Sequence, residues 1–401
     1  MPQSSRPKLF TSSYCCILAA NFLLYFGFWL LIPLLPFYLK EVFSQPEGTI
    51  GLILSCYTLS ALMVRPFSGY LLDTFARKPL YILAYAIFTA LFSGYALCAA
   101  LSLFVVLRVL HGFAFGAVTV GGNTLVVDIM PSARRGEGLG YYGLTNNVAM
   151  SIGPMVGLFL HRTLSFNHIF LISLAACTIG LVMAACVKTR PKSKVRRPPL
   201  SLDRFILTRG IPASVSLLLL SIPYGATTNF VAMYVEEMHL AVAPGFYFVM
   251  LAGGMGISRI FSGKYVDKGY VTECIHYGFF LATAAFTLLG CCEYVNGLCP
   301  GASQVLFFLI PLMQGIGFGI MFPAYNSLYI NLGTNNQRAT ATSTYLTAWD
   351  VGIGIGIVLS GLIAQIFGFA AVYLAGAALS LISMLYFNRI VTPHYHKYRL
   401  R

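Results

Sequence analysis

The chain has 401 residues, of which 58% are hydrophobic and 9% charged, and its formal net charge is +14. A typical soluble domain is about 45–50% apolar and about 25% charged, so this composition excludes an ordinary soluble globule. Apolar stretches of about 20 residues recur along the chain, and such a helix crosses the roughly 30 Å hydrocarbon core of a bilayer. The sequence therefore predicts a protein whose main solvent is lipid.

Twelve such stretches are predicted to be membrane-spanning helices. In chain order they cover residues 13–38, 49–72, 79–99, 102–129, 138–162, 167–187, 211–235, 244–266, 271–291, 302–331, 340–366 and 369–390. Spanning strands would be alternating segments of about 10 residues, whereas these runs are continuous and of helical length. The predicted fold is all-α, an integral membrane protein rather than a barrel.

Lysine and arginine are concentrated in alternate loops, which predicts the orientation in the membrane. The main basic groups lie at residues 6–8, 77–78, 134–135, 188–209 and 397–401. Short cytoplasmic loops are enriched in these residues, so both termini are predicted to be cytoplasmic, with the chain multi-pass in the cytoplasmic (inner) cell membrane. Such loops also suit anionic lipid headgroups of the bilayer, so the positive charge does not predict a nucleic-acid partner.

The chain divides into two related halves. The basic, proline-rich segment 188–210 has six predicted helices on each side, and we interpret it as a cytoplasmic linker between 1–187 and 211–401. The sequence RPFSGYLLD at 65–73 returns as RIFSGKYVD at 259–267. A second alignment, at one constant offset, pairs helix 102–129 with 302–331 and helix 138–162 with 340–366. Two six-helix halves in parallel orientation are predicted.

The loop after the second predicted helix carries GYLLDTFARK at 69–78. This motif resembles the cytoplasmic-loop signature of the major facilitator superfamily of secondary transporters, and the resemblance extends over essentially the whole chain. It implies twelve transmembrane helices in two pseudo-symmetric six-helix bundles. In that family the loop secures the cytoplasmic gate, and an acidic side chain one loop further on can join the network. The predicted gate residues are Gly69, Asp73, Arg77, Lys78 and Asp128.

A physical reason supports this interpretation of the loop. A glycine allows close packing, and Asp73 can face both basic side chains and the positive end of a neighbouring helix. The alternative is that Asp73, Arg77 and Lys78 are solvated loop charges. These loop charges can form a breakable contact, or latch. The repeat of the motif at 259–270 is expected to form a weaker latch, because Lys268-Gly269-Tyr270 replaces the Arg-Lys pair.

The fifth predicted helix resembles the glycine-proline signature of the antiporter, or drug-efflux, branches of the superfamily. The matching residues are Gly140, Ala149, Gly153, Pro154 and Gly157, with alanine at 149 where the signature has glycine. Small residues on one face favour close packing between the halves, and Pro154 introduces a bend. Generic helix packing explains the same residues without an exchange mechanism.

Three ionisable side chains inside predicted spans are candidates for proton coupling: Arg108, His111 and Asp350. Charges at membrane depth are costly and usually functional. Asp350 is near the middle of its span, where burial would penalise the charged carboxylate and let it exchange a proton near physiological pH. Arg108 is near the outer end of its helix and could instead snorkel to the interface. Asp350 and His111 could also be structural.

In the superfamily fold, the first, fourth, seventh and tenth helices line a central cavity. The polar or aromatic candidates that the resemblance places there are Asn21, Tyr25, Phe28, Trp29, Asn123, Tyr224, Tyr325 and Asn326. A mostly apolar cavity with a few polar groups suits an amphipathic small molecule. Any single aromatic residue could equally be a packing or interface residue.

The leading functional hypothesis is a proton-coupled antiporter that exports drugs or other small amphipathic molecules by alternating access. The alternative within transport is proton-coupled uptake of a sugar, organic anion or other small solute, and a membrane-embedded sensor or enzyme is the alternative of another class. No nucleotide-binding loop or clustered metal ligands occur, so we expect no cofactor, no metal and no enzymatic activity. We expect a monomer. The sequence leaves open whether Cys291, Cys292 or Cys299 form a disulfide.

Overall fold

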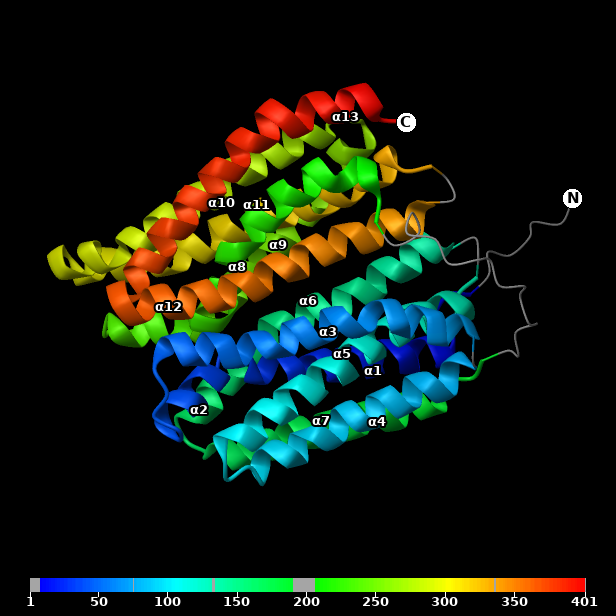
Figure 1. Cartoon of the computed structure of the whole chain (residues 1–401), viewed down its shortest axis with the longest axis horizontal. Coiled ribbons are helices and arrows are strands. Elements are labelled where there is room, and N and C mark those ends of the chain that lie inside the picture. Colours follow the sequence, from blue (N-terminus) through cyan, green and yellow to red (C-terminus); the bar gives the residue numbers. More distant parts are fainter. Residues whose placement is uncertain (1–7, 75, 132–133, 190–205, 335–336, 401) are drawn as a thin grey trace, which may run out of the picture. The chain divides into compact units, whose positions relative to one another are not determined.

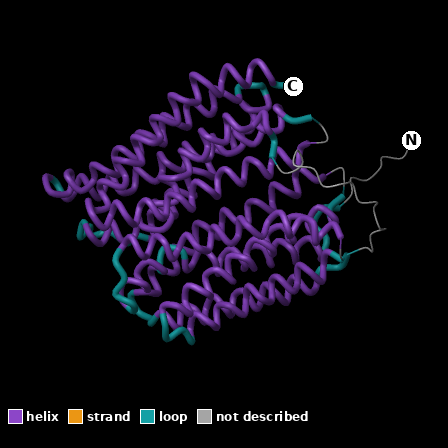
Figure 2. The backbone as a smooth tube through the Cα atoms, in the orientation of Figure 1, coloured by secondary structure: helices purple, strands orange, loops and turns teal. Residues whose placement is uncertain are grey.

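The computed structural model describes residues 8–74, 76–131, 134–189, 206–334 and 337–400. The regular elements in these ranges are all helices, and Figure 2 shows no strand among them. The predicted all-α fold is therefore confirmed. Most of the predicted linker, residues 190–205, lies outside the described residues.

The helices follow the predicted stretches closely (Figure 1). The first seven are α1 (Ser12–Leu31), α2 (Leu35–Glu41), α3 (Glu47–Thr74), α4 (Arg77–Ala96), α5 (Leu101–Ile129), α6 (Arg135–His161) and α7 (Phe166–Cys186). The rest are α8 (Ile211–Glu237), α9 (Gly245–Asp267), α10 (Val271–Leu298), α11 (Pro300–Leu332), α12 (Arg338–Tyr386) and α13 (Thr392–Tyr398). One π-helical turn, Phe387–Val391, joins the last two.

Ten segments of the described chain are long and apolar enough to cross a membrane, against twelve predicted. The difference has two local causes. Helix α6 is long enough but carries polar residues along its length, so it is not among the ten. The last two predicted stretches form one continuous segment, Thr340–Tyr398. Both predicted positions are nevertheless helical.

The chain forms two compact units. Unit 1 comprises Met1–Leu31 and Leu59–Arg197, and unit 2 comprises Ile32–Thr58 and Pro198–Arg401. Helix α3 contributes its first half to unit 2, where the Gly48 amide donates to Gln365 Oε1 at 3.1 Å. The predicted division at 188–210 stays a prediction.

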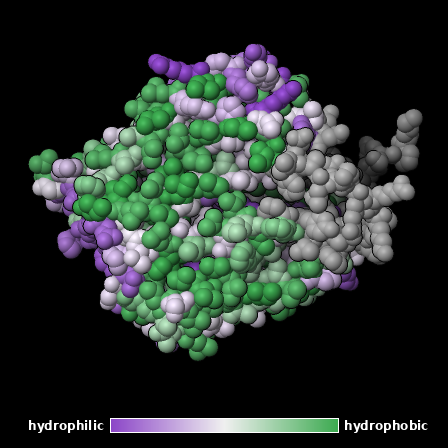
Figure 3. Space-filling model, in the orientation of Figure 1, coloured by the Kyte–Doolittle hydropathy of each residue, from purple (hydrophilic) through white to green (hydrophobic). Residues whose placement is uncertain are grey.

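The exposed surface is rich in large apolar side chains, as the predicted lipid environment requires. Large apolar side chains are exposed on helices throughout the described chain, among them Phe67, Phe159, Phe280 and Phe367, each at least 60% exposed. Figure 3 shows hydrophobic side chains over most of the visible face. In water such a continuous apolar surface would drive aggregation, whereas in a bilayer it is the required exterior.

Glycines bring α8 and α12 into close contact within unit 2. A Cβ atom on Gly225 would lie 2.6 Å from the Ile353 carbonyl oxygen, and a Cβ on Gly352 would lie 2.5 Å from the Leu218 carbonyl oxygen. Only glycine permits this approach of two backbones. The contact holds the aromatic residues of α12 against those of α8.

Helix α12 is interrupted at Gly368, the boundary between the last two predicted stretches. Gly368 has a φ of 80°, a conformation that L side chains avoid. The amide of the next residue, Phe369, donates to Glu237 Oε1 at 3.3 Å. The first backbone amides of a helical segment have no carbonyl group one turn earlier to which they can donate. The Glu237 carboxylate therefore accepts from one such amide after the break.

We predict that Gly368→Ala lowers the stability of the protein, because an alanine at positive φ costs about 1–2 kcal/mol. The apparent melting temperature of the purified protein should fall by several degrees. Gly354→Ala is the matched control in the same helix, since its nearest neighbour, Thr58 Cγ2, would lie at 3.6 Å from the added Cβ. Equal melting temperatures for the two variants would refute the strain at Gly368.

Candidate gating and transport residues

The predicted gate contains an ion pair between two helices of unit 1. Arg77, the first residue of α4, donates from Nη1 to both carboxylate oxygens of Asp128 on α5, at 2.8 and 2.7 Å. The two side chains are only 20% and 26% exposed. A charge-assisted pair of this kind fixes geometry as well as supplying energy, so α4 and α5 are joined at this end of the unit.

Lys78 adds a second connection at the same end. Its Nζ atom donates to the Ala185 carbonyl oxygen in the last turn of α7, at 2.9 Å. A cation at a helix C-terminus also interacts favourably with the helix dipole. Gly69 and Asp73 lie in the last turns of α3, but the side chain of Asp73 is outside the described part of the structure.

Arg108 and His111 lie together in the interior of unit 1. Arg108 is 4% exposed and His111 is 2% exposed. The Tyr95 hydroxyl and His111 Nδ1 are 2.9 Å apart. Phe88 and Phe92 surround the imidazole, with ring centroids 4.4 and 4.7 Å from it. A proton on His111 would therefore sit in a dry, aromatic environment beside a guanidinium.

Asp350 lies on α12, about three turns after the helix begins. It is half-buried, and its Oδ2 atom is hidden from solvent. It follows Trp349, whose ring packs against Tyr224 at 4.9 Å and Phe322 at 4.8 Å.

The residues of the antiporter signature have different environments. Ala149 is fully buried, and Pro154 and Gly157 are also buried within α6. A Cβ on Gly153 would lie 2.9 Å from the Leu30 amide nitrogen, which shows that this glycine permits contact with α1 of the same unit. Gly140 is exposed and has no neighbour within 4 Å of its Cβ position.

The cavity candidates of unit 1 are held mainly by α6 and α5. Asn21 donates to the Tyr142 carbonyl oxygen at 3.2 Å and to Thr145 Oγ1 at 2.7 Å. Trp29 donates from Nε1 to Asn146 Oδ1 at 3.0 Å. These bonds fix the orientation of both α1 side chains. The remaining candidates are Tyr25 and Phe28, whose rings pack against Phe115, and Asn123, which is exposed and bonds back to Thr119.

The cavity candidates of unit 2 divide into packed and available groups. Tyr325 is fully buried and its hydroxyl lies 2.8 Å from Ser216 Oγ, which is the environment of a packing residue. Tyr224 is 4% exposed and contacts Phe318 and Trp349. Asn326 Oδ1 is buried and accepts no hydrogen bond from the described residues.

Sequence reasoning missed one group of side chains in unit 2. Arg259 on α9 lies beside Phe322 of α11, with its Cζ atom 5.8 Å from the ring centroid. Phe322 packs against Trp349, which contacts Tyr224, so the guanidinium lies at the edge of an aromatic cluster. The sequence repeat aligns Arg259 with Arg65. The position of Arg259 inside the predicted helix 244–266 could have marked it as a candidate.

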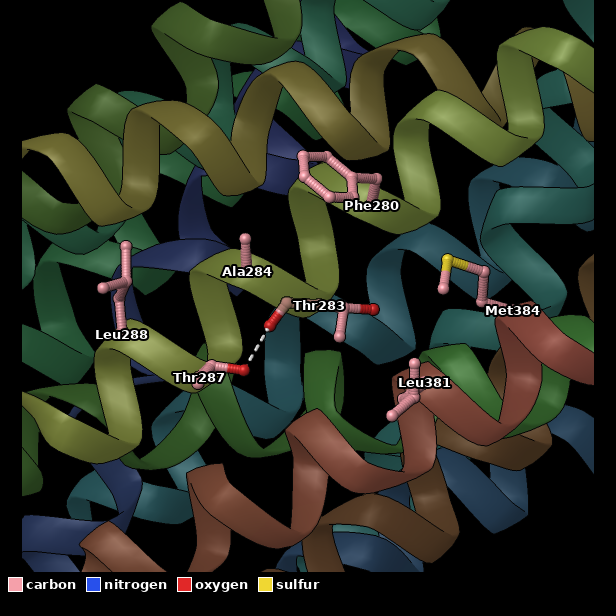
Figure 4. A pocket seen from close by; sticks show the side chains of 7 residues that line it. All are labelled: Phe280, Thr283, Ala284, Thr287, Leu288, Leu381 and Met384. Carbon is pink, nitrogen blue, oxygen red and sulfur yellow. Dashed lines mark hydrogen bonds between the residues drawn. The ribbon is translucent and has the colours of Figure 1, made fainter.

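An apolar groove lies between α10 and α12 (Figure 4). It is open to the exterior, has a volume of about 420 Å³ and is lined by Phe280, Thr283, Ala284, Thr287, Leu288, Leu381 and Met384. The hydroxyl of Thr287 is used internally, donating to the Thr283 carbonyl oxygen at 2.9 Å. Without charged groups to orient a ligand, this groove is not the candidate transport site.

Comparison with known proteins decides the family. The sequence profile of the Major Facilitator Superfamily matches residues 17–331 and 277–399, which together cover nearly the whole chain. The chain belongs to the Major Facilitator Superfamily. The predicted family is therefore confirmed, and the chain is a multi-pass membrane protein of a transporter family.

Two relatives in Staphylococcus aureus illustrate this membership. The chain is 24% identical to the quinolone resistance protein NorA over 361 residues, which cover 88% of this chain and 90% of NorA. It is 23% identical to the staphylopine export protein, covering 86% of this chain and 88% of that protein. Among solved structures, the nucleoside transporter NupG superposes with a TM-score of 0.72 at 15% identity, covering 94% and 98% of the two chains. That likeness confirms the superfamily fold.

We predict that Asp128→Asn loosens the Arg77 end of this superfamily member. Losing the carboxylate charge weakens both hydrogen bonds from the guanidinium, so amide hydrogen exchange in the second turn of α4 should rise severalfold. Glu47→Gln is the control, because it breaks an ion pair of similar length, Lys40 to Glu47 at 2.8 Å, that does not involve α4. If the second turn of α4 exchanges at the same rate in Asp128→Asn as in the unchanged protein, Asp128 does not hold this end.

Proposed function

We propose that this protein is a proton-coupled antiporter that exports small amphipathic molecules. The observation that carries the proposal is the match over more than four-fifths of the chain to the staphylopine export protein and to the quinolone resistance protein NorA. Membership of a transporter superfamily agrees with it. The exported class is amphipathic because apolar and aromatic side chains dominate the interior, with a few polar groups among them.

Proton coupling is assigned to the ionisable groups inside the spans. Asp350 is the first candidate, because a carboxylate hidden from water gains and loses its charge with a large change in its interactions. A group whose protonation changes its preferred environment can bias which conformation is populated. His111 is the second candidate, since it is buried beside Arg108 and bonded to Tyr95.

The proposed orientation places both termini in the cytoplasm. The support is the concentration of basic residues at 6–8, 77–78, 188–209 and 397–401, on the side that the positive-inside rule assigns to the cytoplasm. The Arg77–Asp128 pair then lies at the cytoplasmic end of unit 1. In this arrangement the pair is a breakable latch whose opening accompanies substrate entry from the cytoplasm.

We predict that Asp350→Asn abolishes transport driven by a pH gradient while leaving substrate exchange without a gradient partly intact. The amide cannot carry the proton, but it keeps the size and hydrogen-bonding capacity of the carboxylate. The measurement is flux of a substrate, identified first by a thermal-shift screen of drugs, sugars and organic anions, in proteoliposomes with an imposed pH gradient.

Glu273→Gln is the matched control, because Glu273 is an exposed carboxylate in the first turn of α10. It should transport like the unchanged protein. Gradient-driven flux that survives in Asp350→Asn would remove Asp350 from the coupling mechanism. Accumulation on the opposite side of the membrane would favour uptake over export.

A further inference from the structure

Arg259 is a half-buried cation inside unit 2, and no carboxylate of the described residues pairs with it. It lies about two helical turns before the end of α9, within a segment long and apolar enough to span the membrane. Among the residues that the structure describes, no carboxylate is within ion-pair distance of its guanidinium. An uncompensated charge at membrane depth is expensive, and such a residue usually has a functional counterpart.

The partners that Arg259 does have are aromatic. Its Cζ atom lies 5.8 Å from the centroid of Phe322, and Phe322 in turn packs against Trp349 at 4.8 Å. A cation over an aromatic face recovers only about 0.5–2 kcal/mol. These contacts therefore orient the guanidinium without neutralising it.

The aromatic residues around Arg259 form a structured cluster on neighbouring helices of unit 2. Trp349 meets Phe322 edge to face at 4.8 Å and packs against Tyr224 at 4.9 Å. Phe318 lies beneath, fully buried and 4.8 Å from Tyr224. Phe322 and Trp349 remain partly exposed, as does Arg259. The cluster therefore has a buried floor and a partly exposed rim.

Two polar groups near this rim have unused hydrogen-bonding capacity. Asn326 follows Phe322 by one turn on the same face of α11, and its Oδ1 atom is buried without a donor among the described residues. Tyr345 precedes Trp349 by one turn on the same face of α12, and its hydroxyl has no hydrogen-bond partner among the described residues. The Arg259 guanidinium and the Tyr345 hydroxyl offer donors, and Asn326 Oδ1 offers an acceptor, beside the aromatic surface.

We propose that Arg259, Phe322, Trp349, Tyr224 and Tyr345 bind the carboxylate and ring of an aromatic organic acid. The planar guanidinium fork matches a carboxylate in two parallel hydrogen bonds, and a single cation suits a monoanion. Phe322 and Trp349 supply faces on which an aromatic ring packs. The inference deepens the proposed export function, on which its role in transport rests, by giving the substrate class.

Binding of 1-naphthoate to the full-length protein in nanodiscs tests the site without requiring transport. We expect Arg259→Gln to raise the Kd for 1-naphthoate at least tenfold, while the affinity for the neutral 1-naphthalenemethanol changes less than twofold. The Kd of Arg259→Lys for 1-naphthoate should lie between those of the unchanged protein and Arg259→Gln, because lysine keeps the charge but loses the planar guanidinium fork. Arg162→Gln is the matched control, since Arg162 is an exposed arginine at the end of α6.

The two tryptophans of the chain give a second measurement. In Trp29→Phe only Trp349 remains, and bound 1-naphthoate should quench its fluorescence. An unchanged Kd in Arg259→Gln, an equal loss for acid and alcohol, or no quenching of Trp349 would each overturn the site. If Arg259→Gln fails to fold, Arg259→Lys decides, and a Kd within twofold of the unchanged protein overturns the site.

The flux assay separates this inference from the proposed function. Selective binding of 1-naphthoate through Arg259, without outward movement of any compound in proteoliposomes, would support the site and overturn export. Export of other compounds with no binding of 1-naphthoate would overturn the site and leave export standing.

Discussion

The hydrocarbon core of a bilayer offers no hydrogen bonds, so every backbone amide and carbonyl within it must be satisfied by the protein itself. All regular structure in the described chain is helical for this reason. Small polar side chains obey the same constraint by bonding to their own helix, as Thr119 does with the Phe115 carbonyl oxygen at 2.8 Å and Thr227 with that of Pro223 at 3.0 Å. Polar residues can thus enter a span at little cost.

Because the hydrocarbon core also offers no solvation for charges, charged side chains inside the spans are few, and the partners of each one indicate its role. Arg77 and Asp128 pair with each other at the end of their helices. Arg108 and His111 are buried next to aromatic rings and the Tyr95 hydroxyl. Arg259 has an aromatic neighbour but no carboxylate among the described residues, and this difference is why we propose a latch at Arg77 and a ligand site at Arg259.

Close packing in lipid cannot rely on the hydrophobic effect between helices, so it depends on surfaces that fit closely. Gly225 and Gly352 let α8 and α12 approach to backbone contact in unit 2. That contact brings Tyr224 and Trp349 together and so builds the floor of the aromatic cluster. The glycines matter for function because they position the larger side chains.

The sequence by itself determined the helices, the family and the division of charge between loops, because hydrophobic length and basic loops are local properties. It even located the break at Gly368 as a gap between two apolar stretches. It also selected Arg77 and Asp128, through a motif and a nearby acid. Only the tertiary structure showed that Tyr325 is fully buried with its hydroxyl against Ser216 and that Arg259 lies over Phe322 at the edge of an aromatic cluster. The direction that a side chain takes within a bundle depends on which helices pack beside it, and an apolar sequence with a nearly uniform helical face does not encode that choice locally.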